Sequence, residues 1–362
     1  MAKLKVNICG INFQNPVMTA SGPSSQDADL CIAAAKGGAG GIVTKTISVD
    51  PAEVPRPCMA NINSGFMNVE MWSELTKEQW FEVEYKKAKK INVPIIISIG
   101  HTAYEIKELA PFVKPYADAI EISTHYEGTD VTPFIEAIKI AKREFDVPVF
   151  MKIGPQTDIK NIVKAIEDAG ADGIVMVNSF GPCMSIDVNT GYPIIGSKTG
   201  YGWLSGVSIR PLAIRCIYEA YQAVNIPIIG VGGITNGKDA AEMIMAGASA
   251  VQVCTEAILK GPEVYGRITR ELNAFLDEKG YKDVNEIKGF AHKKAKERKF
   301  RTYSIPPVVN YDNCVKCGTC RTSCVYKAIT VDGKLHIDKD KCFGCGLCVT
   351  KCPKRALKMP LE

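Results

Sequence analysis

Short apolar segments alternate with amphipathic segments between about residue 10 and residue 280. The apolar segments are rich in Val, Ile and Met and lack alternating polar positions, which is typical of strands buried on both faces of a parallel sheet. Eight such strands are predicted, at Pro16–Ala20, Gly41–Lys45, Pro94–Ile99, Ala119–Ser123, Pro148–Ile153, Gly173–Val177, Pro227–Val231 and Ala250–Cys254. Amphipathic helices are predicted between strands, among them Asp158–Ala169, Pro211–Ala223 and Asp239–Ala246.

Eight strands with helices between them predict an α/β fold of the (β/α)8 TIM-barrel type. A doubly wound open sheet is the alternative, and the count of eight strands favours the barrel. No G-x-G-x-x-G motif opens a βαβ unit, because the segment from Gly230 to Gly233 has a different spacing. A nicotinamide-binding domain is therefore not expected in this chain.

Polar residues follow several of the strands at the end where TIM barrels carry their chemistry. Gly232 and Gly233 follow the seventh strand and Thr255 follows the eighth, a position where backbone N–H groups commonly bind a phosphate. Lys45 and Lys152 end the second and fifth strands and suit the anionic edge of a reduced flavin, although each could instead form a salt bridge at the rim.

Eight of the fourteen cysteines lie within the last fifty residues, in two copies of the spacing C-x2-C-x2-C-x3-C. This spacing is typical of two-cluster ferredoxins, in which the fourth cysteine of each copy binds the other cluster. A zinc site or disulfides are the alternatives, but zinc needs only four ligands. One [4Fe-4S] cluster is assigned to Cys314, Cys317, Cys320 and Cys352, and the other to Cys342, Cys345, Cys348 and Cys324. Iron–sulfur clusters with a phosphate-anchored cofactor and no nicotinamide domain indicate FMN.

The 362 residues allow one large and one small domain. We expect an FMN-binding barrel over residues 1–285, a basic linker over 286–304 and a ferredoxin-like domain over 305–362. The basic segment Lys288–Arg301 could attract an acidic redox partner or a nucleic acid, but without interleaved aromatic residues it is better explained as a connecting helix. No apolar run suits a signal peptide or membrane span, and the other six cysteines are scattered, so a cytoplasmic protein is expected.

Several motifs together resemble the dihydroorotate dehydrogenase superfamily, and most closely its dihydropyrimidine dehydrogenase type with a flavin barrel and a two-cluster ferredoxin part. The resemblance covers essentially the whole chain. It rests on NPVMTASGP near the start, TKT at 44–46, FMNVEMWSE at 66–74, MKIGP at 151–155, VNSF at 177–180, SGVSIRP at 205–211, GVGGI at 230–234 and VQVCTE at 251–256.

The resemblance implies two sets of binding residues. The FMN contacts correspond to Ala20, Ser21, Lys45, Thr46, Lys152, Gly206, Gly232, Gly233, Cys254 and Thr255. The pyrimidine contacts correspond to Asn68, Glu70, Asn178 and Ser179. Amide and carboxylate side chains can pair with the alternating N–H and C=O groups of a pyrimidine edge.

The chain departs from the family pattern after the fourth strand, where the family has Asn-Leu-Ser-Cys-Pro and its cysteine transfers a proton. Here Glu121 replaces the asparagine, Thr124 the cysteine and His125 the proline. A hydroxyl needs a base to move a proton, so Thr124, His125 and His101 are the catalytic candidates, with Cys183 as a further one. Glu121 could bind a substrate N–H or place a negative charge near the flavin.

The resemblance implies an FMN- and iron–sulfur-dependent oxidoreductase acting on the CH–CH or C=C bond of a small planar substrate. Uracil or thymine is the leading case, with two clusters connecting the flavin to an external electron donor or acceptor, either a ferredoxin or a flavoprotein subunit that oxidises NAD(P)H. The alternatives are an electron-transfer subunit whose barrel has lost its chemistry and a dihydroorotate dehydrogenase. The segment FMNVEMWSE and the ferredoxin tail both disfavour the latter. A homodimer or hetero-oligomer is expected, with neither nucleic acid nor membrane as a partner.

Overall fold

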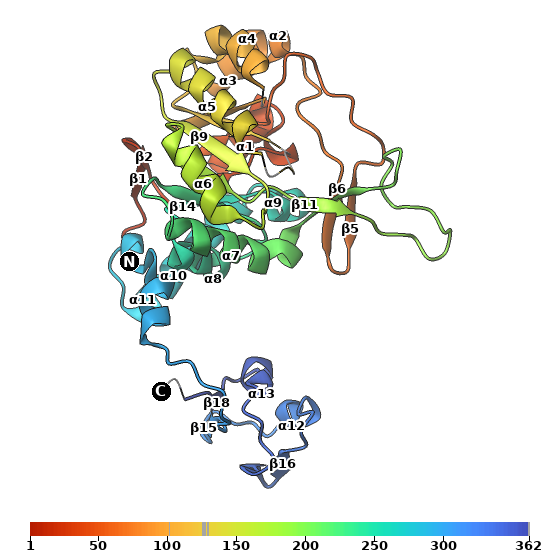
Figure 1. Cartoon of the computed structure of the whole chain (residues 1–362), viewed down its shortest axis with the longest axis vertical. Helices are drawn as coiled ribbons and strands as arrows, with labels where there is room; N and C mark the ends of the chain where they lie inside the picture. The colour runs from red at the N-terminus through yellow and green to blue at the C-terminus, as the bar shows by residue number, and fades with distance from the viewer. Residues whose placement is uncertain (101, 125–127, 129, 361–362) are drawn as a thin grey trace. The chain divides into compact units, whose positions relative to one another are not determined.

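The computed structural model describes residues 1–100, 102–124, 128 and 130–360 (Figure 1). The chain divides into two compact units, Met1–His292 and Lys293–Glu362. None of the helices in the described ranges combines the length and the hydropathy that a membrane crossing requires.

The first unit contains a closed barrel of eight parallel strands. Neighbouring strands pair in the order β3-β14-β13-β10-β9-β8-β7-β4, and a parallel bridge between Met18 and Gly41 joins the two ends of this order. The strands are β3 (Val17–Thr19), β4 (Ile42–Val43), β7 (Ile95–Ile99), β8 (Ala119–Ser123), β9 (Val149–Ile153), β10 (Gly173–Met176), β13 (Ile228–Val231) and β14 (Ala250–Val253). The predicted TIM-barrel fold is therefore confirmed, and each predicted strand contains one of these eight.

Helices follow the barrel strands and cover the barrel (Figure 1). The one after β9, α6, buries Ile159, Ile162, Val163 and Ile166, which share one face because their spacing follows the helical period. Burial of each such side chain stabilises the fold by about 1.5–3 kcal/mol. The helices of this unit are α1 (Ala28–Lys36), α2 (Lys77–Gln79), α3 (Tyr85–Ala88), α4 (Ala103–Val113), α5 (Thr132–Glu144), α6 (Ile159–Asp168), α7 (Arg210–Tyr221), α8 (Gly237–Ala246), α9 (Thr255–Lys260) and α10 (Val264–Lys279).

Strand β4 is shorter than predicted for a physical reason. Thr44 still donates its N–H to Ile96 of β7, at 3.1 Å, but Lys45 donates its N–H to Ser25 O at 2.9 Å instead of to a neighbouring strand. The regular pairing with β7 is thus interrupted at Lys45, which lines the cavity at the barrel rim, and it resumes at Ile47, which donates its N–H to Ser98 O at 3.1 Å.

A four-stranded antiparallel sheet, which the sequence pattern did not predict, projects from one side of the barrel (Figure 1). Two segments far apart in sequence form it, and the central pairing joins β6 to β12 through Asn68 and Trp203. Its strands, in spatial order, are β11 (Phe180–Cys183), β12 (Gly202–Ser205), β6 (Gly65–Asn68) and β5 (Met59–Ile62). A further antiparallel hairpin, β1 (Val6–Ile8) with β2 (Ile11–Phe13), precedes the barrel.

The second unit is small and has two short antiparallel sheets and two short helices. Its core contains the buried residues Cys320, Ile329, Leu335 and Leu357. The sheets pair β15 (Val308–Val309) with β18 (Leu357–Lys358), and β16 (Ile329–Asp332) with β17 (Lys334–Ile337), and the helices are α12 (Thr319–Thr322) and α13 (Leu347–Lys351). Helix α11 (Phe290–Glu297) lies at the junction of the two units.

Candidate active site

A cavity of about 430 Å³ lies at the carboxyl ends of the barrel strands. It falls in the range typical of cofactor and substrate sites. All ten residues expected to bind FMN line it, and so do Asn68, Glu70, Asn178 and Ser179 from the expected substrate set. The structure thus brings together two groups of residues that are spread over more than 230 positions of the chain.

One wall of the cavity carries an ion pair. Lys45 Nζ lies 2.7 Å from Glu70 Oε2, and the two side chains are only 7% and 16% exposed. Beside it, the hydroxyls of Ser21 and Thr46 lie 2.5 Å apart, and Thr46 Oγ1 lies 2.9 Å from Ser98 Oγ. Because a hydrogen bond to a charged group contributes about 1.5–3 kcal/mol, the Lys45–Glu70 contact fixes the position of both side chains.

Three glycines form a backbone cradle in the cavity lining. Gly206, Gly232 and Gly233 have φ angles of +76°, +122° and +74°, which side chains with a Cβ rarely adopt. A Cβ on Gly233 would lie 2.7 Å from both Gly206 O and Arg210 Cβ, so there is no room for one. This packing keeps backbone groups exposed to the cavity where a phosphate could approach closely.

A second buried ion pair connects the cavity to the barrel interior. Lys152 Nζ on β9 lies 3.3 Å from Glu121 Oε1 on β8, and Gln252 on β14 donates from Nε2 to Glu121 Oε2 at 2.7 Å. Lys152 and Gln252 line the cavity, but Glu121 does not and is fully buried. This position does not support the expectation that Glu121 contacts the substrate.

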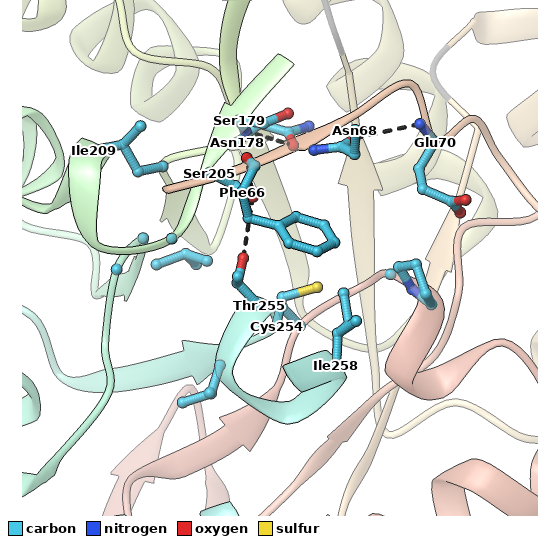
Figure 2. Close-up of a pocket in the computed structure, with 18 of the residues that line it drawn as sticks. Phe66, Asn68, Glu70, Asn178, Ser179, Ser205, Ile209, Cys254, Thr255 and Ile258 are labelled. Carbon is cyan, nitrogen blue, oxygen red and sulfur yellow. Dashed lines mark hydrogen bonds between the residues drawn. The ribbon is translucent and has the colours of Figure 1, made fainter. Parts of the chain in front are cut away.

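Two asparagines supply amide groups to the site, Asn68 from the antiparallel sheet and Asn178 from the segment between β10 and β11. Asn68, at the end of β6, donates from Nδ2 to Trp203 O at 3.3 Å and accepts from Glu70 N at 3.3 Å. Asn178 donates from Nδ2 to Thr124 O at 3.2 Å and accepts from Ser179 N at 2.9 Å. Figure 2 labels these four lining residues and marks the hydrogen bond from Glu70 to Asn68.

The proton-transferring group is the least defined part of the site. Thr124 is buried and does not line the cavity. His101 and His125, the other two catalytic candidates, lie outside the described residues. Cys183 lies on β11, away from the cavity lining, and burial raises the pKa of its thiol. Its position makes it a poor candidate for the proton donor.

Several cavity-lining residues were not predicted as site residues from the sequence, among them Ser205, Gln252 and Gly22. Ser205 lies 3.0 Å from the Thr255 hydroxyl and donates to Phe66 O at 3.3 Å (Figure 2). Gln252 is a single polar residue within the apolar strand Ala250–Val253, and this break in the pattern could have identified it. Gly22 leaves space for Cys254, because a Cβ there would lie 2.7 Å from Cys254 Sγ.

Four features of the lining fit FMN. The glycine cradle suits the phosphate, and Lys45 and Lys152 provide positive charge at the cavity. Gln252 Oε1 is buried and has no hydrogen-bond partner among the described residues, so an N–H donor of a bound ring would satisfy it. Burial raises the pKa of the Cys254 thiol, which leaves a neutral side chain in the lining.

The cysteines of the second unit surround two small cavities. Cys314, Cys317, Cys320 and Cys352 line one, and Cys324, Cys342, Cys345 and Cys348 line the other. These are the two sets of four in the assignment above. Among the described residues, no three Cys, His, Asp or Glu side chains converge closely enough to hold a single metal ion. Four sulfurs around a space, instead of at one point, suit a polynuclear cluster.

The two copies of the cysteine spacing also have equivalent backbone environments. Helices α12 and α13 each follow a glycine with positive φ, Gly318 at +78° and Gly346 at +81°. The last cysteine of each copy accepts a backbone N–H from four residues later: Ala328 N to Cys324 Sγ at 3.4 Å and Ala356 N to Cys352 Sγ at 3.2 Å. Such bonds stabilise the thiolate form that iron requires.

Comparisons with known proteins match both units. The dihydroorotate dehydrogenase family model matches residues 3–276, and the 4Fe-4S dicluster domain model matches residues 307–359. Relatives from Methanothermobacter thermautotrophicus and Pyrococcus abyssi are each 36% identical to this chain, over 302 and 304 residues. Each match covers 80% of this chain. It covers 98% of the length of the Methanothermobacter protein and 99% of the length of the Pyrococcus protein. Both relatives are named dihydroorotate dehydrogenase B (NAD(+)), catalytic subunit.

A relative from Methanosarcina mazei with the same name is 36% identical over 304 residues, which are 80% of this chain and 95% of the relative. These names favour the dihydroorotate alternative over the dihydropyrimidine dehydrogenase type that the motifs suggested. Each match uses nearly the whole relative but only four fifths of this chain. This chain therefore carries a segment beyond what it shares with these relatives.

Proposed function

The chain belongs to the dihydroorotate dehydrogenase family, and on that premise we propose that it oxidises dihydroorotate to orotate with FMN in the barrel cavity. The observation that carries the proposal is the cavity itself, which is lined by a glycine cradle, two lysines and the amides of Asn68 and Asn178. When bound, FMN would take a hydride from the substrate and release electrons singly to iron–sulfur clusters.

The residues of the cavity divide into a cofactor side and a substrate side. Gly206, Gly232 and Gly233 would hold the FMN phosphate, and Lys152 would lie beside its ring. Asn68 and Asn178 are proposed to orient the substrate ring. Their side-chain contacts to backbone groups fix which amide atoms remain available to a ligand.

The second unit is proposed to hold two [4Fe-4S] clusters, with the cysteines assigned as above. Because the matched relatives are named catalytic subunits, we propose that electrons leave through these clusters to a separate protein, either a ferredoxin or a subunit that uses NAD(+). The name also supports assembly with at least one further subunit. A cytoplasmic location accords with the use of many unpaired cysteines.

A second candidate is the oxidation or reduction of an uncharged dihydropyrimidine such as dihydrouracil. It is favoured by the Lys45–Glu70 ion pair, because Glu70 occupies the ammonium that could otherwise bind the carboxylate of orotate. An uncharged ring would need no free cation in the cavity.

The two candidates are separated by anaerobic reduction of the bound flavin. Purified protein containing FMN and iron is mixed separately with dihydroorotate and with dihydrouracil, and flavin bleaching and product are followed with viologen as acceptor. We expect dihydroorotate to bleach the flavin and form orotate. Bleaching by dihydrouracil alone would establish the second candidate. If dithionite reduces the flavin but neither compound does, both proposals fail.

A further inference from the structure

A buried carboxylate lies at the centre of the barrel, next to the proposed flavin site. Glu121, on β8, is fully buried, and its hydrogen-bond donor Gln252 is on β14. Three strands separate β8 from β14 in each direction around the barrel, so these two strands face one another. Their 2.7 Å hydrogen bond therefore crosses the barrel interior.

Glu121 contacts two side chains that line the cavity, although Glu121 itself does not line it. Glu121 Oε1 lies 3.3 Å from Lys152 Nζ, and Glu121 Oε2 accepts from Gln252 Nε2. Lys152 is only 4% exposed, so water screens this pair weakly. A ligand in the cavity thus meets an ammonium whose charge is balanced from inside the barrel.

The charge balance extends to the other lysine of the cavity. Lys45 is paired with Glu70 at 2.7 Å, so each of the two lysines in the lining has its own carboxylate. The two lysine–carboxylate pairs differ in one respect. Glu70 lines the cavity and can contact a ligand, whereas Glu121 can act only through Lys152 and Gln252.

We infer that Glu121 is a positioning residue that holds Lys152 and offsets its charge, so that the site stabilises negative charge on a bound flavin ring less strongly than Lys152 alone would. The inference rests on the proposed FMN site. Its physical basis is that an ammonium released from its carboxylate partner can approach a ligand in a dry site more closely and interact more strongly with charge developing there, so the effect of Glu121 passes through Lys152.

Sulfite provides a direct measurement because it adds to N5 of oxidised flavin and leaves a negative charge on the ring. Its dissociation constant is measured by flavin absorbance in the full-length protein loaded with FMN. Glu121→Gln removes the negative charge but keeps the size and an acceptor for Gln252, so sulfite should bind about tenfold more tightly. Lys152→Met should weaken sulfite binding. In the Lys152→Met background, the added Glu121→Gln change should alter the dissociation constant of sulfite less than twofold.

Glu84→Gln is the matched control. Glu84 is also buried, accepts a hydrogen bond from Ala28 N at 2.9 Å and does not line the cavity, so its substitution should leave sulfite binding unchanged. If Glu121→Gln does not fold, Glu121→Asn serves in its place, since asparagine is the residue of the family pattern.

The outcomes separate the inference from the proposed function. If the wild-type protein does not bind FMN, the proposed function and the inference are both wrong. If it binds FMN but Glu121→Gln leaves sulfite binding unchanged, or changes it equally with and without Lys152, only the inference is overturned.

Discussion

Replacement of Gly233 by alanine tests whether the glycine cradle holds the FMN phosphate. Gly233 has a φ of +74° and packs against Gly206 O and Arg210. A methyl group at this position would disturb the backbone of the cradle while leaving every charged side chain of the cavity in the sequence. We expect FMN to bind 10- to 100-fold more weakly, on the order of 1.4–3 kcal/mol.

The magnitude follows from two contributions. An alanine in the left-handed region is strained by about 1–2 kcal/mol. The added Cβ would also lie 2.7 Å from a carbonyl oxygen and from Arg210 Cβ, and overpacking of this kind costs about 1–3 kcal/mol. Arg210 cannot move aside freely, because it lies 2.8 Å from Asp239 and 3.4 Å from Glu242. Displacement of the cradle is therefore the easier way to relieve the clash.

The assay combines FMN binding, measured by quenching of flavin fluorescence, with denaturant unfolding of the protein without flavin. Gly191→Ala is the matched control, because Gly191 has a φ of +78° and no described atom lies within 4 Å of its Cβ position. The control should lose about 1 kcal/mol of unfolding free energy from backbone strain and keep its FMN affinity. If Gly233→Ala binds FMN as tightly as this control does, the cradle is not the phosphate site.

Three further predictions concern the clusters, the substrate and the proton donor. Cys352→Ser should remove the cluster proposed for Cys314, Cys317 and Cys320, so that iron analysis finds about four fewer iron atoms per chain and one electron paramagnetic resonance signal is lost. Cys324→Ser should remove the signal of the other cluster. Identical spectra of the two variants would contradict the crossed assignment. Glu70→Gln should free the Lys45 ammonium and raise the affinity for orotate relative to uracil by about tenfold, measured by spectral titration, since a charged hydrogen bond contributes about 1.5–3 kcal/mol; an unchanged ratio would exclude Lys45 as the carboxylate site. The Cys183→Ala variant should reduce its flavin with substrate at a rate within about twofold of the wild-type rate, because Cys183 does not line the cavity. A rate loss of more than tenfold would make Cys183 a candidate proton donor again.

The barrel could be predicted from sequence because its strands are buried on both faces. Segments such as Ile95–Ile99 and Val149–Ile153 consist mainly of β-branched and other apolar residues, and burial enforces that composition. The antiparallel sheet could not be predicted in this way. Its strand Phe180–Cys183 contains Gly181 and Pro182, and the strands that pair across its centre are separated by more than 130 residues.

The residues of the candidate site that belong to sequence motifs could be predicted. Contacts between side chains on distant strands could not. Lys45, Lys152 and Asn178 were identified at strand ends and do line the cavity. The position of Glu121 inside the barrel was not recognised, because only the folded barrel brings β8 opposite β14. A charged residue within an apolar strand was the available signal, and it indicates an internal partner more readily than a ligand contact.

The antiparallel sheet has a consequence for engineering the protein. Asn68 comes from the segment after β4, and Asn178 and Trp203 come from the segment after β10, yet β6 and β12 pair directly. A chimera that takes one of these segments from a relative would join two strand edges that were not selected for each other. The substrate side should therefore be transferable between family members only when both segments are exchanged together, whereas the barrel that holds the glycine cradle can stay unchanged.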